Sequence, residues 1–265
     1  MPEHVLEAVG LHRAYGAVRA VDDVSFALPE GGSLGIVGES GSGKTTTARI
    51  VVGLERADGG QVQVRGRVRG ARSRGRAQRL ARAREVQMVF QDPYLSLDPR
   101  TSVEDVLRET LRLHFPSTDH DRRIRKLLDQ VGLGTRATDA RPRQLSGGQR
   151  QRVAIARALA VEPAVLVLDE AVAALDVSVQ AQILNLLADI REETRIGYLF
   201  ITHDLGVVRC VTDEVLVMRR GRVIEAGPTD EVLATPQHPY TRLLLESVPR
   251  PGWDPEAIAA ARRAL

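Results

Sequence analysis

The sequence lacks several features, and each absence excludes a class of protein. Its 265 residues include one cysteine, Cys210, so an internal disulfide framework and a cysteine-rich zinc or iron–sulfur site are excluded. Cys210 lies in an apolar stretch, which predicts a buried thiol. No uninterrupted apolar run approaches the ~18 residues of a membrane span, and residues 1–10 lack the basic start of a secretory leader. We therefore expect any membrane role to be that of a peripheral subunit.

Lysine is also scarce, because Lys44 and Lys126 are the two lysines of an arginine-rich chain. The net charge of +3 is too small to indicate nucleic acid or an anionic membrane as a partner. Residues 65–84 form one strongly basic stretch, with two interpretations: a nucleic-acid surface, or a solvated loop and short helix. The second is favoured because no aromatic residue is interleaved for base stacking.

The chain is long enough for one large α/β domain or two small ones. Short apolar runs at residues 34–37, 165–168 and 198–201 predict buried strands, and residues 165–168 (VLVL) are typical of a central parallel strand. Helical patterns over residues 102–129 lie between two strand-rich regions. This order predicts an α/β fold with an inserted helical subdomain.

A glycine-rich loop, residues 38–45 (GESGSGKT), follows the first of these strands and precedes a helical pattern. Its glycines let backbone N–H groups surround phosphates, the lysine can reach the β- and γ-phosphates, and the threonine hydroxyl can ligate Mg²⁺. We call residues 38–45 the phosphate loop. The predicted nucleotide contacts are Gly38, Glu39, Ser40, Gly41, Ser42, Gly43, Lys44, Thr45 and Thr46.

Two acidic residues, Asp169 and Glu170, end the buried strand at residues 165–168. Ligands of open α/β sheets bind at the carboxyl ends of the strands. We therefore expect Asp169 to hold Mg²⁺ and Glu170 to polarise the attacking water.

The stretch LSGGQRQRVAIARAL, residues 145–159, precedes VLVLDE and completes a set of motifs. With these motifs the sequence resembles the ATP-binding-cassette (ABC) ATPases from about residue 5 onward. The resemblance implies a P-loop core with a mainly parallel sheet, an antiparallel β subdomain, and a helical subdomain inserted at about residues 92–160. It also implies one nucleotide-binding domain over residues 1–240 and a separate tail over residues 241–265.

The resemblance assigns roles outside the phosphate loop. Tyr15 matches the aromatic residue that stacks on adenine, although a packing role is the alternative. Gln91 matches the residue that contacts Mg²⁺ and the attacking water, and His203 matches the histidine that contacts the γ-phosphate, with a core histidine as the alternative. Asp176 matches the loop that links two subunits. The residues matching the family's signature donors are Ser146, Gly147, Gly148 and Gln149.

The resemblance implies ATP and Mg²⁺ as ligands and a head-to-tail dimer of identical or different ATPase subunits. Each ATP would lie between the phosphate loop of one subunit and the signature donors of the other. Two positions depart from the family pattern, since Ala171 replaces the usual proline and Ala173 the usual serine. Neither change removes a reacting group, so we expect an active ATPase with its contacts between subunits weakened.

The end of the sequence, QHPYTRLLLESVP at residues 237–249, resembles the ATPase subunits of oligopeptide and dipeptide importers. Nickel and glutathione importers share much of this pattern. The resemblance implies membrane permease subunits as partners, indirectly a solute-binding protein, no nucleic acid, and a peripheral location on the cytoplasmic face of the membrane. A soluble cassette ATPase acting on nucleic acid is the alternative, and an exporter is disfavoured.

Three apolar residues, Tyr94, Leu95 and Leu97, lie in a proline-bounded loop after Gln91. They are candidates to receive a helix of a membrane partner. The alternative is burial within the helical subdomain.

Overall fold

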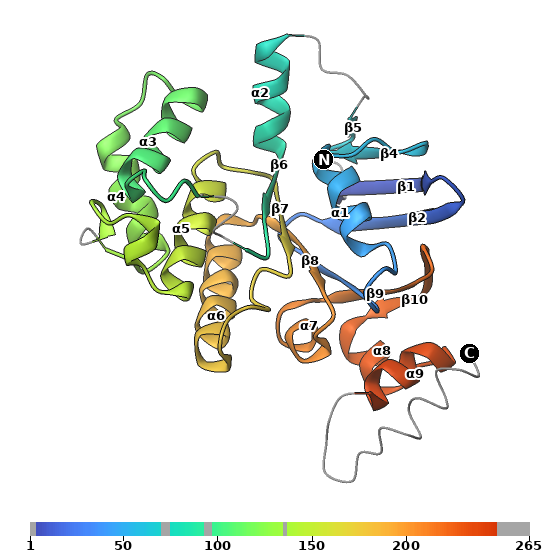
Figure 1. The fold of residues 1–265 in the computed structure, drawn as a ribbon. Coiled ribbons are helices and arrows are strands. Elements are labelled where there is room, and N and C mark those ends of the chain that lie inside the picture. Colours follow the sequence, from blue (N-terminus) through green and yellow to red (C-terminus); the bar gives the residue numbers. More distant parts are fainter. Residues whose placement is uncertain (1–3, 70–74, 93–96, 135–136, 248–265) are drawn as a thin grey trace.

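The large sheet of the computed structural model has six strands in the order β10-β9-β3-β8-β7-β6 (Figure 1). The structure describes residues 4–69, 75–92, 97–134 and 137–247. All neighbouring strands run parallel except the β9–β10 hairpin. The strands are β3 (Ser33–Val37), β6 (Val86–Val89), β7 (Val165–Asp169), β8 (Gly197–Thr202), β9 (Glu214–Arg219) and β10 (Arg222–Pro228).

A second, antiparallel sheet has four strands in the order β2-β1-β4-β5. Its strands are β1 (His4–Tyr15), β2 (Val18–Pro29), β4 (Gly59–Val64) and β5 (Arg67–Val68). Together the two sheets confirm the predicted fold class, a mainly parallel core with an antiparallel subdomain. Strand β1, which pairs with both β2 and β4, was not predicted from the sequence.

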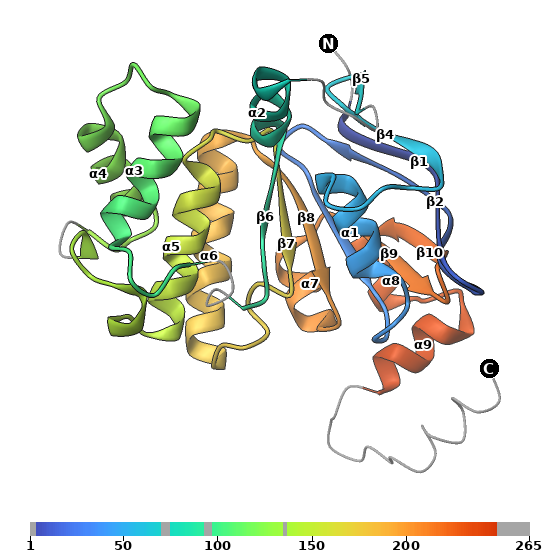
Figure 2. The ribbon, with the colours of Figure 1, turned by 45° about the horizontal axis from the view of Figure 1, so that its top comes forward.

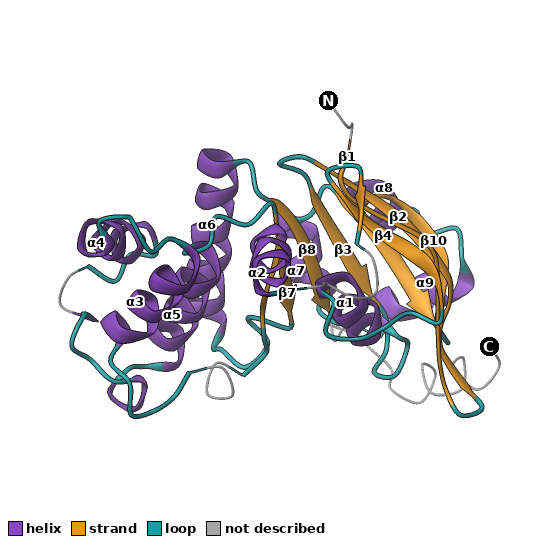
Figure 3. Ribbon diagram, turned by 90° about the horizontal axis from the view of Figure 1, so that it is seen from above, coloured by secondary structure: helices purple, strands orange, loops and turns teal. Residues whose placement is uncertain are grey.

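Alternate residues of the central strands face two different hydrophobic clusters. On β7 and β8, Leu166 and Phe200 face the cluster on the helical side, whereas Val167 and Leu199 face the other sheet. Helix α1 (Lys44–Val52) lies between the two sheets (Figure 3). The apolar strands of the sequence are therefore covered on both faces, as expected for buried parallel strands.

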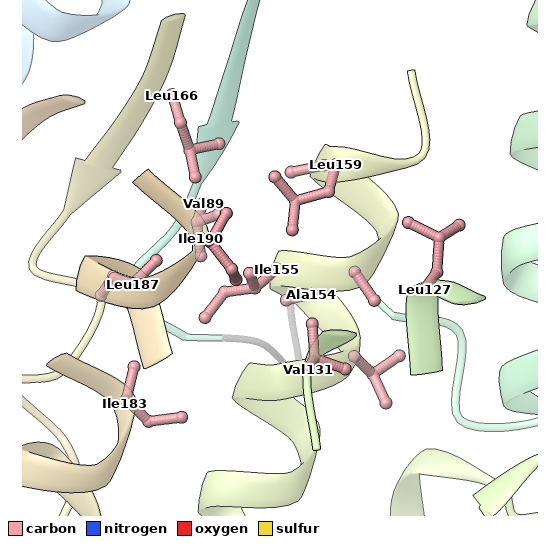
Figure 4. Close-up of a cluster of buried hydrophobic side chains, with 14 of the residues drawn as sticks. Val89, Leu127, Val131, Ala154, Ile155, Leu159, Leu166, Ile183, Leu187 and Ile190 are labelled. Atoms are coloured by element: carbon pink, nitrogen blue, oxygen red, sulfur yellow. The ribbon is translucent and has the colours of Figure 1, made fainter. Parts of the chain in front are cut away.

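The helical subdomain lies beyond the opposite face of the large sheet (Figures 1 and 3). It lies between β6 and β7 in the chain, as predicted, and joins the sheet through one continuous cluster (Figure 4). In that cluster Ile155 lies between Leu187 and Val131, so the helices and the sheet share one core. The helices of this side are α3 (Val103–His114), α4 (His120–Gln130), a 3-10 helix (Pro142–Gln144), α5 (Gly147–Leu159) and α6 (Val177–Thr194).

The basic stretch includes the exposed helix α2 (Arg76–Glu85), which has no buried residue. Arg69 before it is buried and donates hydrogen bonds to the carbonyls of Val51, at 2.7 Å, and Val52, which end α1. The Arg84 guanidinium lies 4.2 Å from the centre of the Phe115 ring. Part of the positive charge thus supports the fold by capping a helix and stacking on a ring.

The last described helices, α7 (Leu205–Val211), α8 (Thr229–Ala234) and α9 (Pro239–Glu246), flank the β9–β10 hairpin (Figure 2). The prediction of a buried Cys210 is wrong: α7 buries Leu205, Val207 and Val208, and Cys210 lies on its exposed side. The predicted division at residue 240 falls within α9 and stays a prediction. No helix of the described residues is long and apolar enough to cross a membrane.

Candidate active site

The predicted catalytic and phosphate-binding residues gather where three parallel strands end. The phosphate loop follows β3, Glu170 follows β7 and His203 follows β8. Because β3, β8 and β7 are neighbours and run parallel, their carboxyl ends form one edge of the sheet. This edge is where open α/β sheets place their ligands.

The phosphate loop is held closely by backbone from remote parts of the chain. Gly43 has a φ of +106°, and a Cβ there would lie 2.1 Å from the Ala20 carbonyl oxygen of β2. The Gly221 N–H, in the β9–β10 turn, donates to the Ser42 carbonyl at 2.9 Å. Only glycine fits at position 43, because a side chain would be strained and would displace β2.

Lys44 is 5% exposed and begins α1. Its Nζ donates hydrogen bonds to the carbonyls of Gly38 and Glu39, at 2.7 and 2.8 Å. Burial lowers the pKa of Lys44, and the carboxylates of Glu170, Asp169 and Glu39 act against that shift. The structure therefore places the one cation of the phosphate loop among three acidic side chains.

Thr45 and Asp169 bring two oxygen groups together at the start of α1. Thr45 Oγ1 lies 3.5 Å from Asp169 Oδ1. Burial, followed by the charge of Glu170, raises the pKa of Asp169, although Arg49, Thr45 and Lys44 oppose the shift. The described residues contain no cluster of three histidine, cysteine or acidic side chains able to hold a metal alone. A hydroxyl and one carboxylate instead fit Mg²⁺, which commonly takes its remaining ligands from water and nucleotide phosphates.

Glu170 and His203 form a pair at the same edge of the sheet. His203 Nδ1 lies 3.1 Å from Glu170 Oε1, and the two side chains are 60% and 23% exposed. Glu170 has a φ of +48°, and its N–H donates to the Ile201 carbonyl of β8 at 2.8 Å. The exposure of His203 excludes the alternative of a core histidine. The Glu170 carboxylate is thus reached by solvent and contacted by the His203 ring.

Tyr15 and Gln91 are also exposed. Tyr15 ends β1 with 45% of its surface accessible, and the Arg13 guanidinium lies 4.8 Å from its ring centre. Its exposure disfavours the packing alternative for this residue. Gln91 lies two residues after β6, which pairs with β7. Their contacts with adenine and Mg²⁺ stay predictions.

The signature loop, residues 145–149, lies apart from the phosphate loop. Ser146 caps α5, accepting from the Gln149 N–H at 3.2 Å, while Gln149 Oε1 accepts from the Ser146 N–H at 2.9 Å. Helix α5 lies on the opposite side of the large sheet from α1 (Figure 3). One chain therefore does not bring its signature loop onto its own phosphate loop.

The signature loop packs against the loop that precedes α6. A Cβ at Gly148 would lie 2.4 Å from Val179 Cγ1 of α6. Asp176 caps α6 by accepting from the Val179 N–H at 3.0 Å. The hydrogen bond from the Ser178 hydroxyl, followed by the one from Val179, lowers the pKa of Asp176. The starts of α5 and α6, with both predicted subunit-contact motifs, are thus adjacent.

Two family models match this chain. The "ABC transporter" family model matches residues 21–173, and a model of the "Oligopeptide/dipeptide transporter, C-terminal region" matches residues 224–263. The first match spans more than half of the chain. The chain belongs to the ABC transporter family.

Relatives of this ABC ATPase are ATP-binding proteins of peptide transport. The chain is 44% identical over 264 residues to the oligopeptide transport ATP-binding protein OppF of Bacillus subtilis, covering 97% of this chain and 86% of OppF. It is 47% identical over 246 residues to OppD of Mycobacterium tuberculosis, covering 92% of this chain. The chain spans 40% of the length of OppD, so it matches only part of that relative.

A solved cassette structure shows the same fold. The dimeric ATP-binding cassette MJ0796, in a post-hydrolysis state with ADP and phosphate bound, superposes with a TM-score of 0.74 at 27% identity. The match covers 84% of this chain and 98% of MJ0796. The P-loop fold predicted from the sequence is therefore confirmed, and ATP is the nucleotide of this family.

Two residues that depart from the family pattern lie beside Glu170. Ala171 is buried, while Ala173 is exposed and its N–H donates to the Glu170 carbonyl at 3.0 Å. The turn that places Glu170 thus forms without the usual proline and serine. An exposed position 173 leaves its effect on a second subunit a prediction.

The loop after Gln91 has one described apolar residue among its three candidates. Leu97 is 3% exposed within the helical cluster, so it is buried, as one of the two interpretations of this loop stated, while Tyr94 and Leu95 lie outside the described residues. Tyr240 of α9 was not predicted to touch the nucleotide site, yet its hydroxyl accepts a hydrogen bond from the Glu39 N–H at 3.2 Å. The HPYT motif was visible in the sequence, but nothing in it indicated which loop it contacts.

Proposed function

We propose that this ABC ATPase hydrolyses ATP at the edge formed by β3, β7 and β8 and so powers uptake of peptides through separate membrane subunits. One observation carries the proposal: Lys44, Thr45, Asp169, Glu170 and His203 converge there from three parallel strands. Few other uses fit a buried lysine among carboxylates at a helix N-terminus.

The phosphate loop would hold the triphosphate through its backbone N–H groups and the N-terminus of α1. Lys44, which donates to two loop carbonyls, has three N–H donors and would also reach the β- and γ-phosphates. The Thr45 hydroxyl and the Asp169 carboxylate, aided by Gln91, would hold Mg²⁺, which when bound neutralises charge on those phosphates. Tyr15 would stack on adenine from the end of β1.

Hydrolysis needs a base and a group that orients it. Glu170 would accept a proton from the water whose oxygen forms the new bond to the γ-phosphorus, as the bond to the β–γ bridging oxygen breaks. His203, 3.1 Å from Glu170, would orient that carboxylate and contact the γ-phosphate. The exposure of both side chains leaves them accessible to the nucleotide.

A second ATPase subunit would complete each site. The signature loop lies across the sheet from its own phosphate loop, so Ser146, Gly147 and Gly148 can reach a nucleotide only on another subunit. The N-terminus of α5 would then face the γ-phosphate and stabilise its charge. The dimer of MJ0796 supports this arrangement.

Peptides are the proposed solute because the C-terminal match is to the oligopeptide/dipeptide transporter region and because OppF is a relative over nearly the whole chain. Permease subunits and, indirectly, a solute-binding protein are the proposed partners. The chain would act at the cytoplasmic face of the membrane. A cassette domain over residues 1–240 followed by a tail over residues 241–265 is also part of the proposal.

The Glu170→Gln variant tests the proposed chemistry. It should bind ATP as the parent does and hydrolyse it about 10² to 10⁴ times more slowly, the usual contribution of a general base. Lys44→Ala is the companion variant and should lose ATP binding itself. Equal turnover of Glu170→Gln and the parent, measured as phosphate release, would refute the assignment of Glu170.

A further inference from the structure

The HPYT motif begins a helix whose start is fixed by several polar contacts. Glu225 of β10 accepts hydrogen bonds from the backbone N–H groups of Gln237 and His238, at 2.7 and 3.1 Å. His238 caps α9, because its Nδ1 accepts from the Tyr240 N–H at 3.0 Å. The first turn of α9 is therefore tied to the β9–β10 hairpin.

Tyr240, in that first turn, is 2% exposed. It packs in one cluster with Val37, the residue that leads into the phosphate loop, and the Arg219 guanidinium lies 4.7 Å from its ring centre. A ring that is buried in this cluster and in contact with a guanidinium has little freedom to move its hydroxyl. That hydroxyl accepts from the Glu39 N–H at 3.2 Å, joining residues 201 positions apart.

The peptide group between Gly38 and Glu39 is held at both of its polar atoms. Its N–H donates to Tyr240, and its carbonyl accepts from Lys44 Nζ at 2.7 Å. The orientation of this one peptide plane thus links the α9 hydroxyl to the position of the Lys44 ammonium. A backbone N–H that loses its partner favours rotation of the peptide toward another one.

We propose that Tyr240 is a positioning residue of the nucleotide site: its hydroxyl fixes the Gly38–Glu39 peptide, and through it Lys44, so that α9 sets the affinity for ATP. The inference rests on the proposed function, because it takes the phosphate loop to be the ATP site. It gives the HPYT segment a role within the cassette.

The test is the Tyr240→Phe variant, which keeps the buried ring and removes only the hydroxyl. We expect its Kd for ATP, measured by calorimetric titration, and its KM to rise about three- to tenfold, the effect of losing one neutral hydrogen bond. Turnover at saturating ATP should stay within about twofold of the parent. Among the described residues, the side chains of Glu170 and His203 bond to each other, and the Glu170 N–H bonds to Ile201 rather than to this peptide. An unchanged Kd would overturn the proposal.

Tyr198→Phe is the matched control. Tyr198 is also buried, and within the described part of the chain its hydroxyl has no hydrogen-bond partner. It pairs with Ser33 at the start of β3, whereas the phosphate loop follows the end of that strand. The Tyr198→Phe variant should bind ATP with the parent's Kd. An equal rise of the Kd in Tyr198→Phe and Tyr240→Phe would mean a general packing effect and would overturn the proposal.

Two further variants separate the possible failures. Glu225→Ala releases the start of α9 far from the nucleotide and should raise the Kd in the same direction by a smaller factor. Lys44→Ala, in the same titration, should lose ATP binding. If Lys44→Ala binds ATP as the parent does, the proposed function fails; if it loses binding while Tyr240→Phe is unaffected, only the role of Tyr240 fails.

Discussion

The two loops proposed to clamp ATP are supported in opposite ways. The phosphate loop is held by residues far away in the chain: Ala20 lies against Gly43, Gly221 bonds to Ser42 and Tyr240 bonds to Glu39. The signature loop fixes itself, because the reciprocal hydrogen bonds of its capping box join residues three apart. The first loop depends on contacts from the whole fold, whereas the hydrogen bonds that shape the second loop lie within a short sequence.

The two loops should therefore respond differently to substitution, in both the stability of the fold and the affinity for nucleotide. A change in the phosphate loop disturbs two sheets and the C-terminal helices together, so it should lower both the stability of the fold and the affinity for nucleotide. A change in the signature loop disturbs the contact between α5 and α6 and should leave the phosphate loop intact. One substitution in each loop tests the contrast, and a third, at Asp169, tests the charge beside the phosphate loop; they follow from the largest expected effect on stability to the smallest.

Gly43→Ala should have the largest effect. Its Cβ would meet the Ala20 carbonyl at 2.1 Å with φ at +106°, so we expect a loss of about 3 kcal/mol of unfolding free energy, together with loss of ATP binding. Gly41→Ala is the control, since its φ is +80° but no atom lies within 4 Å of a Cβ there. That variant should lose only about 1 kcal/mol, the strain of a left-handed residue. Equal losses in chemical denaturation would refute the close packing of Gly43.

Gly148→Ala should have an intermediate effect on stability and a different effect on function. Its Cβ would lie 2.4 Å from Val179 Cγ1, so α5 and α6 must separate, at a cost of about 2 kcal/mol. Each subunit should still bind ATP with the parent's Kd, while hydrolysis is lost. Gly147→Ala, whose nearest neighbour would be Leu175 Cδ2 at 3.4 Å, should keep the parent's melting temperature. Loss of ATP binding by Gly148→Ala would show that the two loops depend on each other within one chain.

Asp169→Asn should have the smallest effect on stability, and one of opposite sign. Burial and the charge of Glu170 raise the pKa of Asp169 above 3.8, so the folded protein binds its proton more tightly than the unfolded chain. The parent therefore loses stability as pH rises from 3.8 through the raised pKa of Asp169. The Asp169→Asn variant has no titratable carboxyl at this position, so it does not lose that stability.

Without nucleotide, Asp169→Asn should gain about 1 kcal/mol at neutral pH, which is about 2 to 4 °C in melting temperature, while ATPase activity is lost. The gain should shrink toward acid pH, where Asp169 is protonated in the parent as well. Denaturation curves of both proteins, recorded between acid and neutral pH, measure this gain in stability. A gain that is constant with pH would contradict the raised pKa.

The contrast also explains how much the sequence alone could predict. The buried strands β3, β7 and β8, the phosphate loop and the acidic end of β7 all follow from local patterns, so they were predicted. The capping box of Ser146 and Gln149 is also local, but it was not predicted. The family resemblance supplied Tyr15, Gln91 and His203, which no local pattern singles out. The contacts of Ala20, Gly221 and Tyr240 with the phosphate loop depend on how distant elements pack, and no signal in a single sequence specifies that.

The wrong expectation has a related cause. Cys210 lies among apolar residues, yet a helix as short as α7 buries one side, and the sequence did not show which side faces β3 and β9. Leu97 lies in a loop by sequence but in the helical core by packing. In both cases burial was set by tertiary contacts rather than by the composition around the residue.

Each ATP is proposed to lie between two subunits, and native mass spectrometry of the Glu170→Gln variant with ATP is the decisive measurement. The variant is measured alone and bound to its membrane subunits. We expect two cassettes with two nucleotides in at least one of these samples, and a single cassette when Lys44→Ala is added to the same chain. A single cassette that carries ATP in both samples would refute the shared site.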